Sequence, residues 1–332
     1  MSDQEIDLYY VDSAIGDDTV QHISPGRSIP GSRGIWNIVK FLPGGNGDDV
    51  QVQNLLYEPG VVGPPLCRAV KRIVRQKSPA RDNSLMIKRS LLCMTRANHS
   101  VETETSKASN AIPVVRMLCW YHDAFYVYIA MEYCAIGNLR DWIHDYPFPG
   151  ETWAREVTKQ ILSVLVELNC SQLAHRNIKP SNILIASALP IQIKVSDFHN
   201  AKWMAEDDGL RTQVGNLDYS APEVRGERDH AGRVTTEYNT SVDMWSLGIV
   251  LHEILSGSHP FGRPGHPRYS ESRYQEYLGS DSGQISLSLL EGNTSQYGKT
   301  MVAYMLSRDP AARPTPLEAL GDQWFLKDIR PV

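Results

Sequence analysis

The residues most able to do chemistry lie in one short stretch, residues 175–182, which reads HRNIKPSN. It holds a basic pair, His175 and Arg176, and a lysine, Lys179, two positions after Asn177. Phosphoryl transfer needs phosphates held in place, charge neutralised by a metal ion and a nucleophile aimed at phosphorus. A single acidic residue in place of Asn177 would add a base. The stretch therefore raises the question of whether the chain transfers a phosphoryl group or keeps only the frame for it.

Four more blocks follow HRNIKPSNILI along the chain. They read KVSDFHN (194–200), GNLDYSAPEV (215–224), SVDMWSLGIVLHEILSG (241–257) and RDPAARPT (308–315). In this order the five blocks resemble those of the eukaryotic protein kinases. The resemblance covers roughly residues 35–328 and is much more specific in the second half than in the first. It implies an α+β, bilobal fold with a nucleotide cleft between a small sheet-rich lobe and a larger helical lobe.

The resemblance assigns roles to polar residues of the second half. Asn182 and Asp197 match the two residues that hold Mg²⁺ in protein kinases, and hard oxygen ligands suit that ion. Lys179 matches the lysine that meets the transferred phosphate in Ser/Thr-type members. Taken singly, each of these residues could equally be a helix cap or a hydrogen-bonded loop side chain.

Other residues of these blocks imply architecture rather than chemistry. Glu223 and Arg313 resemble the buried ion pair that anchors the activation segment. Asp243, with the pair His175 and Arg176, resembles the group that holds the catalytic loop in place. Their presence predicts that the scaffold is kept.

The first half carries looser matches to a nucleotide site. Lys71 in CRAVKRI resembles the lysine that holds the α- and β-phosphates, although an exposed strand lysine is a common alternative. Gly45 and Gly47 in PGGNGDDVQV fit the first two glycines of a phosphate-covering loop. An ordinary Gly-rich hairpin turn fits almost as well, and Asp48 and Asp49 would repel phosphates.

The segment around residues 131–134 resembles the hinge of the family. Met131 would be the gatekeeper, and the backbone near Glu132 and Cys134 would meet an adenine edge. A buried strand end is the alternative interpretation, and both can hold together.

Three departures from the kinase pattern fall at positions that have a catalytic role in the family. Asn177 replaces the aspartate that accepts the proton of the substrate hydroxyl. Loss of a positioned general base costs about 10²–10⁴-fold in rate, or roughly 3–5 kcal/mol of barrier. Lys88 falls where the family has the glutamate that pairs the strand lysine, unless another register brings Glu102 or Glu104 forward. His199 replaces the glycine that lets this segment flip.

Periodicity independently predicts the elements that position these residues. Short apolar or alternating runs predict antiparallel strands near 35–42, 50–57, 66–74, 114–121 and 125–133, with one helix at 84–97. Longer helical patterns occupy 152–169 and 241–257, the latter with Ser241 as N-cap and Gly257 at its end. The chain should therefore comprise a flexible extension (1–34), a strand-rich lobe (35–134) and a helical lobe (135–328). The polar stretch 262–284 could be a docking loop, and a solvated insertion is the preferred interpretation.

Composition narrows the class of protein. The 332 residues are 42% hydrophobic, with a formal net charge of −5 and no long basic stripe, which argues against nucleic-acid binding. The five cysteines form no CxxC pair, so we expect reduced thiols. Neither a secretory signal nor a membrane span is evident. We expect a cytoplasmic or nuclear protein that is not secreted.

These observations predict a pseudokinase with little or no phosphotransfer, which keeps weak ATP and Mg²⁺ binding and acts as a scaffold or allosteric partner of other proteins. The alternative is an active Ser/Thr protein kinase that transfers the γ-phosphate of ATP to protein substrates. Thr212 is then a candidate activation-loop phosphosite. The partner or substrate is not readable from the sequence.

Overall fold

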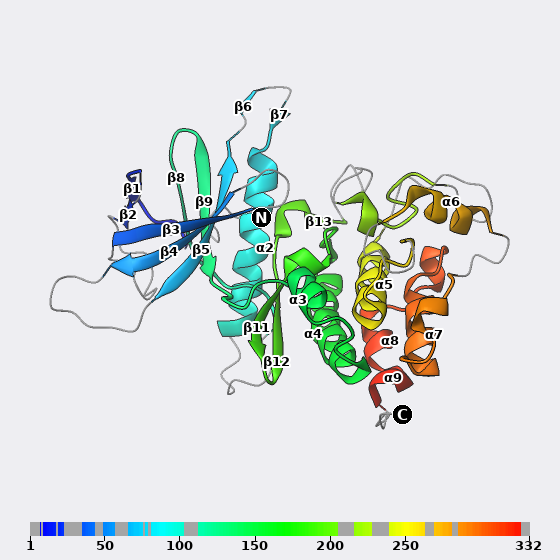
Figure 1. Cartoon of the computed structure of the whole chain (residues 1–332). Coiled ribbons are helices and arrows are strands. Elements are labelled where there is room, and N and C mark those ends of the chain that lie inside the picture. The colour runs from blue at the N-terminus through cyan, green and yellow to red at the C-terminus, as the bar shows by residue number, and fades with distance from the viewer. Residues whose placement is uncertain are drawn as a thin grey trace. The chain divides into compact units, whose positions relative to one another are not determined.

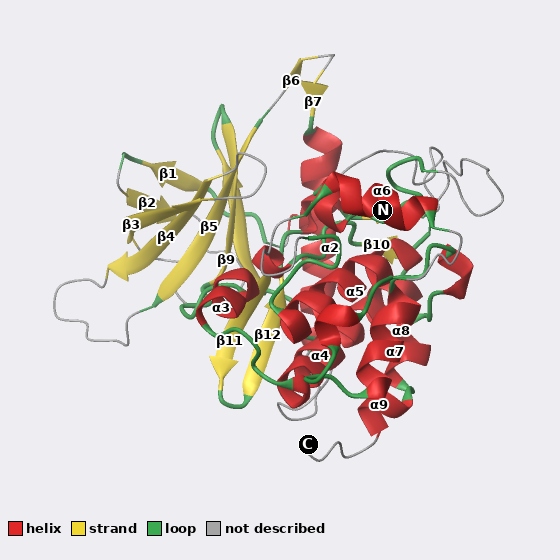
Figure 2. Cartoon of the chain, turned by 45° about the vertical axis from the view of Figure 1, so that its right-hand side comes forward, coloured by secondary structure: helices red, strands yellow, loops and turns green. Residues whose placement is uncertain are grey.

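The computed structural model describes residues 7, 9–17, 19–22, 35–43, 49–56, 66–75, 77–78, 81–102, 112–204, 216–227, 239–262, 269–280 and 285–326. The chain divides into two compact units, 1–134 and 135–332. The first is an antiparallel sheet with one long helix (Figure 1). The second is mainly helical (Figure 2). The predicted α+β architecture of two lobes is confirmed.

A seven-stranded antiparallel sheet forms the N-terminal unit, in the order β1-β2-β3-β4-β5-β9-β8. The strand bounds are β1 Ser13–Ile15, β2 Thr19–His22, β3 Ile35–Pro43, β4 Asp49–Leu56, β5 Cys67–Val74, β8 Met117–His122 and β9 Tyr126–Glu132. A short hairpin, β6 (Lys77–Ser78) and β7 (Arg81–Asp82), precedes helix α2 (Ser84–Glu102). The strands β3, β4, β5, β8 and β9 are the five that the alternating runs predict. Helix α2 continues beyond its predicted end at residue 97 to Glu102.

The register of the sheet separates its two faces. Lys71 of β5 lies opposite Val50 of β4 and Ile129 of β9, so these side chains share one face. Val70 points to the other face, where it belongs to a buried cluster. The members of that cluster are Val11, Val20, Trp36, Val70, Cys119, Tyr121, Tyr128 and Ala130. The face opposite Lys71 therefore has a core of its own.

Residues 9–22 complete this sheet. The N–H of Val11 donates to the carbonyl of Trp120 over 3.0 Å, at the β8 edge. The β1–β2 hairpin then pairs with β3 at the other edge. Val11 and Val20 are each only 1% exposed. The predicted flexible extension 1–34 is therefore wrong for residues 9–22, because strand pairing and the burial of two valines hold them in place.

A buried arginine joins this hairpin to the sheet. The guanidinium of Arg68 lies 3.9 Å from the ring centre of Trp36. Its Nε and Nη2 donate to Oε1 of Gln53 over 2.9 and 2.7 Å, and its Nη1 donates to Nε2 of His22 over 2.7 Å. Nδ1 of His22 therefore carries the proton and donates to Oγ of Ser13 over 2.7 Å. Burial, and then the charge of Arg68, lowers the pKa of His22 to about 3, so the ring is neutral at pH 7.

The C-terminal unit is built around α4 (Glu151–Cys170) and α5 (Ser241–Ser256), which pack against each other. Helix α4 also packs on α8 (Pro316–Leu320), and α5 packs on α7 (Gln296–Met305). The remaining elements are α3 (Leu139–Asp145), α6 (Glu271–Gly279), α9 (Gln323–Leu326), the paired strands β10 (Leu173–Ala174) and β13 (Lys202–Trp203), and the hairpin β11 (Ile183–Ala188)–β12 (Ile191–Val195). Within the described residues, no helix is long and apolar enough to cross a membrane.

Helix α5 is the central helix of this unit, since every residue from Val242 to Ser256 is buried. A Cβ on Gly248 would come within 2.8 Å of Cβ of Met305, so glycine allows the close approach to α7. The helix ends at Gly257, which has the left-handed φ of 68° that glycine tolerates. The N-cap is Thr240 rather than the predicted Ser241, and its side chain makes no capping bond.

Candidate active site

Asp243 anchors the loop that carries HRNIKPSN. Its carboxylate accepts the backbone N–H groups of His175 and Arg176 over 2.7 and 2.8 Å. Burial raises the pKa of Asp243 to about 6, against the opposing effect of these two donors. Arg176 has a left-handed φ of 60°, and its Nε donates to the carbonyl of Asn200 over 2.6 Å. The predicted architectural role of Asp243 is confirmed.

Three of the predicted site residues come together on this loop and the segment that follows it. Nδ2 of Asn177 donates to Oδ2 of Asp197 over 2.7 Å. Nδ2 of Asn182 donates to the carbonyl of Asn177 over 2.9 Å and lies 3.4 Å from the same oxygen of Asp197. Asp197 has a φ of 68°, a strained conformation for a residue other than glycine. The result is one carboxylate held between two side-chain amides.

Lys179 and His175 complete the loop. Lys179 is in extended backbone and only 8% exposed, and its carbonyl accepts the N–H of Asn182 over 2.9 Å. His175 is fully buried, and its ring centre lies 4.7 Å from that of Phe198. Burial lowers the pKa of His175 to about 4, so the ring is neutral at pH 7. It therefore serves as packing for the loop.

His199 occupies a position that does not require glycine. It lies in the 3₁₀ turn Phe198–Asn200, and among the described residues from Ser196 to Asn200 only Asp197 has a positive φ. A side chain at position 199 therefore fits this conformation without backbone strain.

A buried ion pair anchors the segment 216–227. Nη1 and Nη2 of Arg313 donate to the two carboxylate oxygens of Glu223 over 2.6 and 2.9 Å. The two side chains are 0% and 5% exposed. Bidentate geometry of this kind gives both strength and orientation. The predicted pairing of Glu223 with Arg313 is confirmed.

Three successive backbone carbonyls of this segment are each bound by a side chain. The carbonyl of Leu217 accepts from Nη2 of Arg225, and that of Asp218 accepts from Nε2 of His259 over 2.9 Å. The carbonyl of Tyr219 accepts from Oγ of Ser246 over 2.8 Å. The short 3₁₀ turn Leu217–Tyr219 is thus fixed by donors from three places in the unit.

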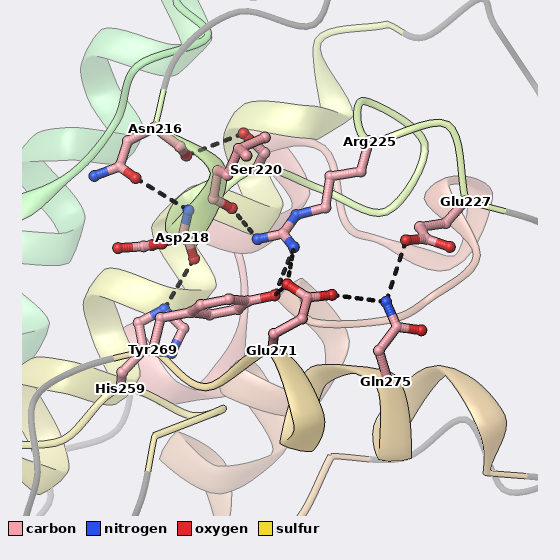
Figure 3. A network of polar contacts seen from close by, with 10 residues as sticks. Asn216, Asp218, Ser220, Arg225, Glu227, His259, Tyr269, Glu271 and Gln275 are labelled. Carbon is pink, nitrogen blue, oxygen red and sulfur yellow. Dashed lines mark hydrogen bonds and ion pairs between the residues drawn. The ribbon is translucent and has the colours of Figure 1, made fainter. Parts of the chain in front are cut away.

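Arg225 extends this anchoring to helix α6. Figure 3 shows its guanidinium beside the Tyr269 hydroxyl, which accepts from Nη1 over 2.6 Å and donates to Oε2 of Glu271 over 2.6 Å. The guanidinium also lies over the ring of Tyr274, 4.2 Å from its centre. The solvated insertion predicted for 262–284 is therefore wrong for residues 269–280, which contain α6. Sequence patterns gave no signal for Arg225, because its partner lies 44 residues away.

A buried carboxylate lies behind the same turn. Both oxygens of Glu253 lie 3.0 Å from the hydroxyl of Tyr219, which also accepts from Nη2 of Arg140 over 3.4 Å. Burial raises the pKa of Glu253 to about 8, although the Tyr219 bond and the charge of Arg140 favour the ionised form. Sequence patterns missed this residue, since it reads as one more position on a buried helix.

A pocket opens beside Asn177, wholly within the C-terminal unit. One side is formed by the anchored loop and the other by the segment that the Glu223–Arg313 pair holds. Its lining residues are Arg176, Asn177, Ile178, Asn216, Tyr219, Ser220, Ala221, Val224, Val242 and Ser246. Its wall is a mixture of polar and apolar side chains.

The predicted nucleotide residues of the N-terminal unit that the structure describes lie on β5 and at the end of β9. Lys71 is half-buried in β5, and Met131 and Glu132 end β9, where Oε1 of Glu132 accepts the N–H of Arg116 over 2.7 Å. Cys134 follows, half-buried. Gly45, Gly47, Glu104 and Thr212 lie outside the described residues.

The helix expected to carry the glutamate partner of Lys71 has Lys88 exposed to solvent. Glu102 is the last residue of α2, which places it at the far end of the helix from the predicted position. The register that puts Lys88 at the family's glutamate position stays a prediction.

Comparison with known proteins decides the family. The protein kinase domain model matches residues 69–325, more than half of the chain. This chain belongs to the protein kinase family. The match begins within β5, so strands β3 and β4 of this kinase lie outside it.

The chain is similar to several serine/threonine kinases. It is 30% identical over 229 residues to serine/threonine-protein kinase RAD53 of Saccharomyces cerevisiae, which covers 68% of this chain and 27% of that protein. It is 33% identical over 200 residues to serine/threonine-protein kinase cds1 of Schizosaccharomyces pombe (60% and 41% covered). It is 29% identical over 239 residues to serine/threonine protein kinase OSK3 of Oryza sativa subsp. indica (69% and 43%). The chain spans less than half the length of each relative.

These names do not support the prediction of a pseudokinase, and they favour the alternative of an active Ser/Thr kinase.

The donor set in this kinase fits a metal ion that arrives with a nucleotide. Within the part of the chain that the structure describes, no group of three or more His, Cys, Asp and Glu side chains could hold a metal by itself. Nδ2 of Asn182 lies 3.4 Å from Oδ2 of Asp197, so one amide and one carboxylate side chain lie together. Mg²⁺ is commonly bound by one or two carboxylates together with substrate phosphates. The residues therefore fit Mg²⁺ bound to ATP.

Proposed function

We propose that this kinase transfers the γ-phosphoryl group of ATP to serine or threonine side chains of proteins, slowly. The observation that carries the proposal is the Asn182–Asp197 pair, in which Asn182 lies on the loop that Asp243 anchors. The contact brings together the amide and the carboxylate that match the two Mg²⁺-holding residues of protein kinases. HRNIKPSN and the GNLDYSAPE segment are of the Ser/Thr type.

Each residue has a part in the reaction. Asn182 and Asp197 would hold Mg²⁺, which supplies positive charge to the phosphates when bound. Lys179 would meet the transferred phosphate, and Lys71 the α- and β-phosphates. The hydroxyl oxygen bonds to the γ-phosphorus while the bond to the β–γ bridging oxygen breaks, which releases ADP.

Asn177 makes this step slow. Its amide oxygen can accept a hydrogen bond from the substrate hydroxyl and so orient it, but a neutral amide does not take up the proton. The proton passes instead to an oxygen of the transferred phosphoryl group. The expected rate penalty is about 10²–10⁴-fold.

A second candidate function is a binding protein without useful transfer. The observation that favours it is the hydrogen bond from Asn177 to Asp197, which occupies an oxygen of the metal-ligand position. In that case the kinase fold would present surfaces to partner proteins and bind ATP weakly.

A transfer assay separates the two functions. Purified chain is incubated with radiolabelled ATP, Mg²⁺ and a mixture of serine and threonine peptides, alongside Asp197→Ala. Slow labelling that the Asp197→Ala variant lacks is the expected result. Labelling that is absent from both proteins, or equal in both, would leave the binding protein as the better description.

A further inference from the structure

Asn177 supplies a contact that the aspartate it replaces could not make. Its Nδ2 donates to Oδ2 of Asp197 over 2.7 Å, and Nδ2 of Asn182 approaches the same oxygen at 3.4 Å. An aspartate at position 177 has no proton to donate when ionised. Asn177 is 4% exposed and Asp197 is half-buried, so the bond is partly shielded from water. The negative charge of Asp197 is therefore stabilised by neutral amides that belong to the protein.

The same substitution removes one negative charge from the place where nucleotide phosphates would bind. With an aspartate at 177, two carboxylates would come within hydrogen-bonding distance of each other. Like charges this close disfavour ionisation of both, and a divalent cation is the usual means of relieving them. With Asn177 there is one carboxylate instead of two, and it already has amide donors. An incoming polyphosphate meets less repulsion before any metal is present.

We propose that Asn177 lowers the metal requirement of nucleotide binding, so that this kinase binds ADP or ATP with little help from Mg²⁺. The inference rests on the nucleotide binding of the proposed function but not on transfer. A unit charge several ångströms from the phosphates, in a partly shielded site, changes affinity on the order of tenfold. The ratio of the Kd in EDTA to the Kd in Mg²⁺ should therefore be about tenfold smaller for the wild type than for Asn177→Asp.

Thermal stabilisation measures the affinity for ADP without turnover, since a ligand that binds only the folded form raises the melting temperature. The full chain and Asn177→Asp are titrated with ADP, once in EDTA and once in Mg²⁺. We expect the wild type to be stabilised in EDTA nearly as well as in Mg²⁺, and Asn177→Asp to require the metal. Equal Kd ratios for the two proteins, or no stabilisation of the wild type by ADP under either condition, would overturn the proposal.

A second variant isolates the hydrogen bond from the charge. Asn177→Leu is close in size, adds no charge and removes the donor to Asp197. We expect it to bind ADP in EDTA several-fold more weakly than the wild type, because the Asp197 carboxylate loses its closest amide donor. The same affinity as the wild type would show that the bond has no part. The variant also keeps the proposal testable if Asn177→Asp does not fold, which its melting curve without ligand reveals.

The outcome is independent of the transfer assay. A wild-type chain that labels no peptide, yet binds ADP without metal, would refute the proposed activity and support this inference. Peptide labelling together with strictly Mg²⁺-dependent ADP binding would support the proposed activity and refute this inference.

Discussion

The two units of this kinase differ in how they relate to the family pattern. In the C-terminal unit each expected structural contact is present: Asp243 holds the loop, Glu223 pairs with Arg313, and Asn182 approaches Asp197. In the N-terminal unit the family match begins only in β5, and residues 9–22 add two strands and a buried cluster. The contacts that the family pattern predicts are therefore found in the C-terminal unit, while the N-terminal unit is stabilised by contacts that the pattern does not include.

The largest effect should come from breaking the anchor of the C-terminal unit. Arg313→Met leaves Glu223 as an uncompensated buried charge, which typically costs about 3–5 kcal/mol of unfolding free energy. Urea denaturation followed by tryptophan fluorescence measures this loss of unfolding free energy. The double variant Glu223→Leu/Arg313→Met is the control, and it should recover most of the loss. An Arg313→Met protein as stable as the wild type would mean that the pair is not part of the frame.

Glu253 gives the C-terminal unit a pH dependence. Burial raises its pKa to about 8 from an ordinary value of 4.5, so the folded state binds the proton more tightly than the unfolded state does. Stability from this group is present below about pH 4.5 and is lost as the pH rises to 8. Glu253→Gln should lack that loss and gain roughly 1–3 kcal/mol on the wild type between these limits. Denaturation curves at pH 5 and pH 8.5 that shift in parallel for both proteins would contradict this.

Urea denaturation also tests whether residues 9–22 are packed against the sheet. Val20→Ala removes two buried methyl groups and should cost about 1–2 kcal/mol of unfolding free energy. Thr19→Ala, at an exposed position of the same strand, is the matched control and should change little. If residues 9–22 were a flexible extension, the two variants would be equally stable in urea.

The smallest effect concerns the link between segment 216–227 and α6. Tyr269→Phe removes a hydroxyl that bonds both Arg225 and Glu271, which should cost about 0.5–1.5 kcal/mol. Tyr304→Phe serves as control, because Tyr304 is 53% exposed. Chemical denaturation of both variants is sufficient. A loss at Tyr304 as large as that at Tyr269 would remove the evidence for the link.

The parts of this structure that sequence predicts are those with local signals. Apolar alternation predicts β3, β4, β5, β8 and β9, and the ordered motifs predict the Glu223–Arg313 pair. The metal-binding role of Asn182 and Asp197 stays a prediction. The strands of residues 9–22 have three and four residues, too few to show a period. Contacts such as His22 with Arg68 join residues 46 positions apart, and no local pattern encodes them. Gly45 and Gly47 remain a prediction, because they lie outside the described residues.

The proposed slow phosphotransfer is limited by one group, the amide of Asn177, in a C-terminal unit whose other expected contacts are present. The most direct test compares kcat of the wild type and Asn177→Asp on one serine peptide at saturating Mg-ATP. The account predicts a gain of about 10²–10⁴-fold for Asn177→Asp, abolished when Asp197→Ala is added. An Asn177→Asp protein that folds and binds Mg-ATP but transfers no faster than the wild type would contradict it.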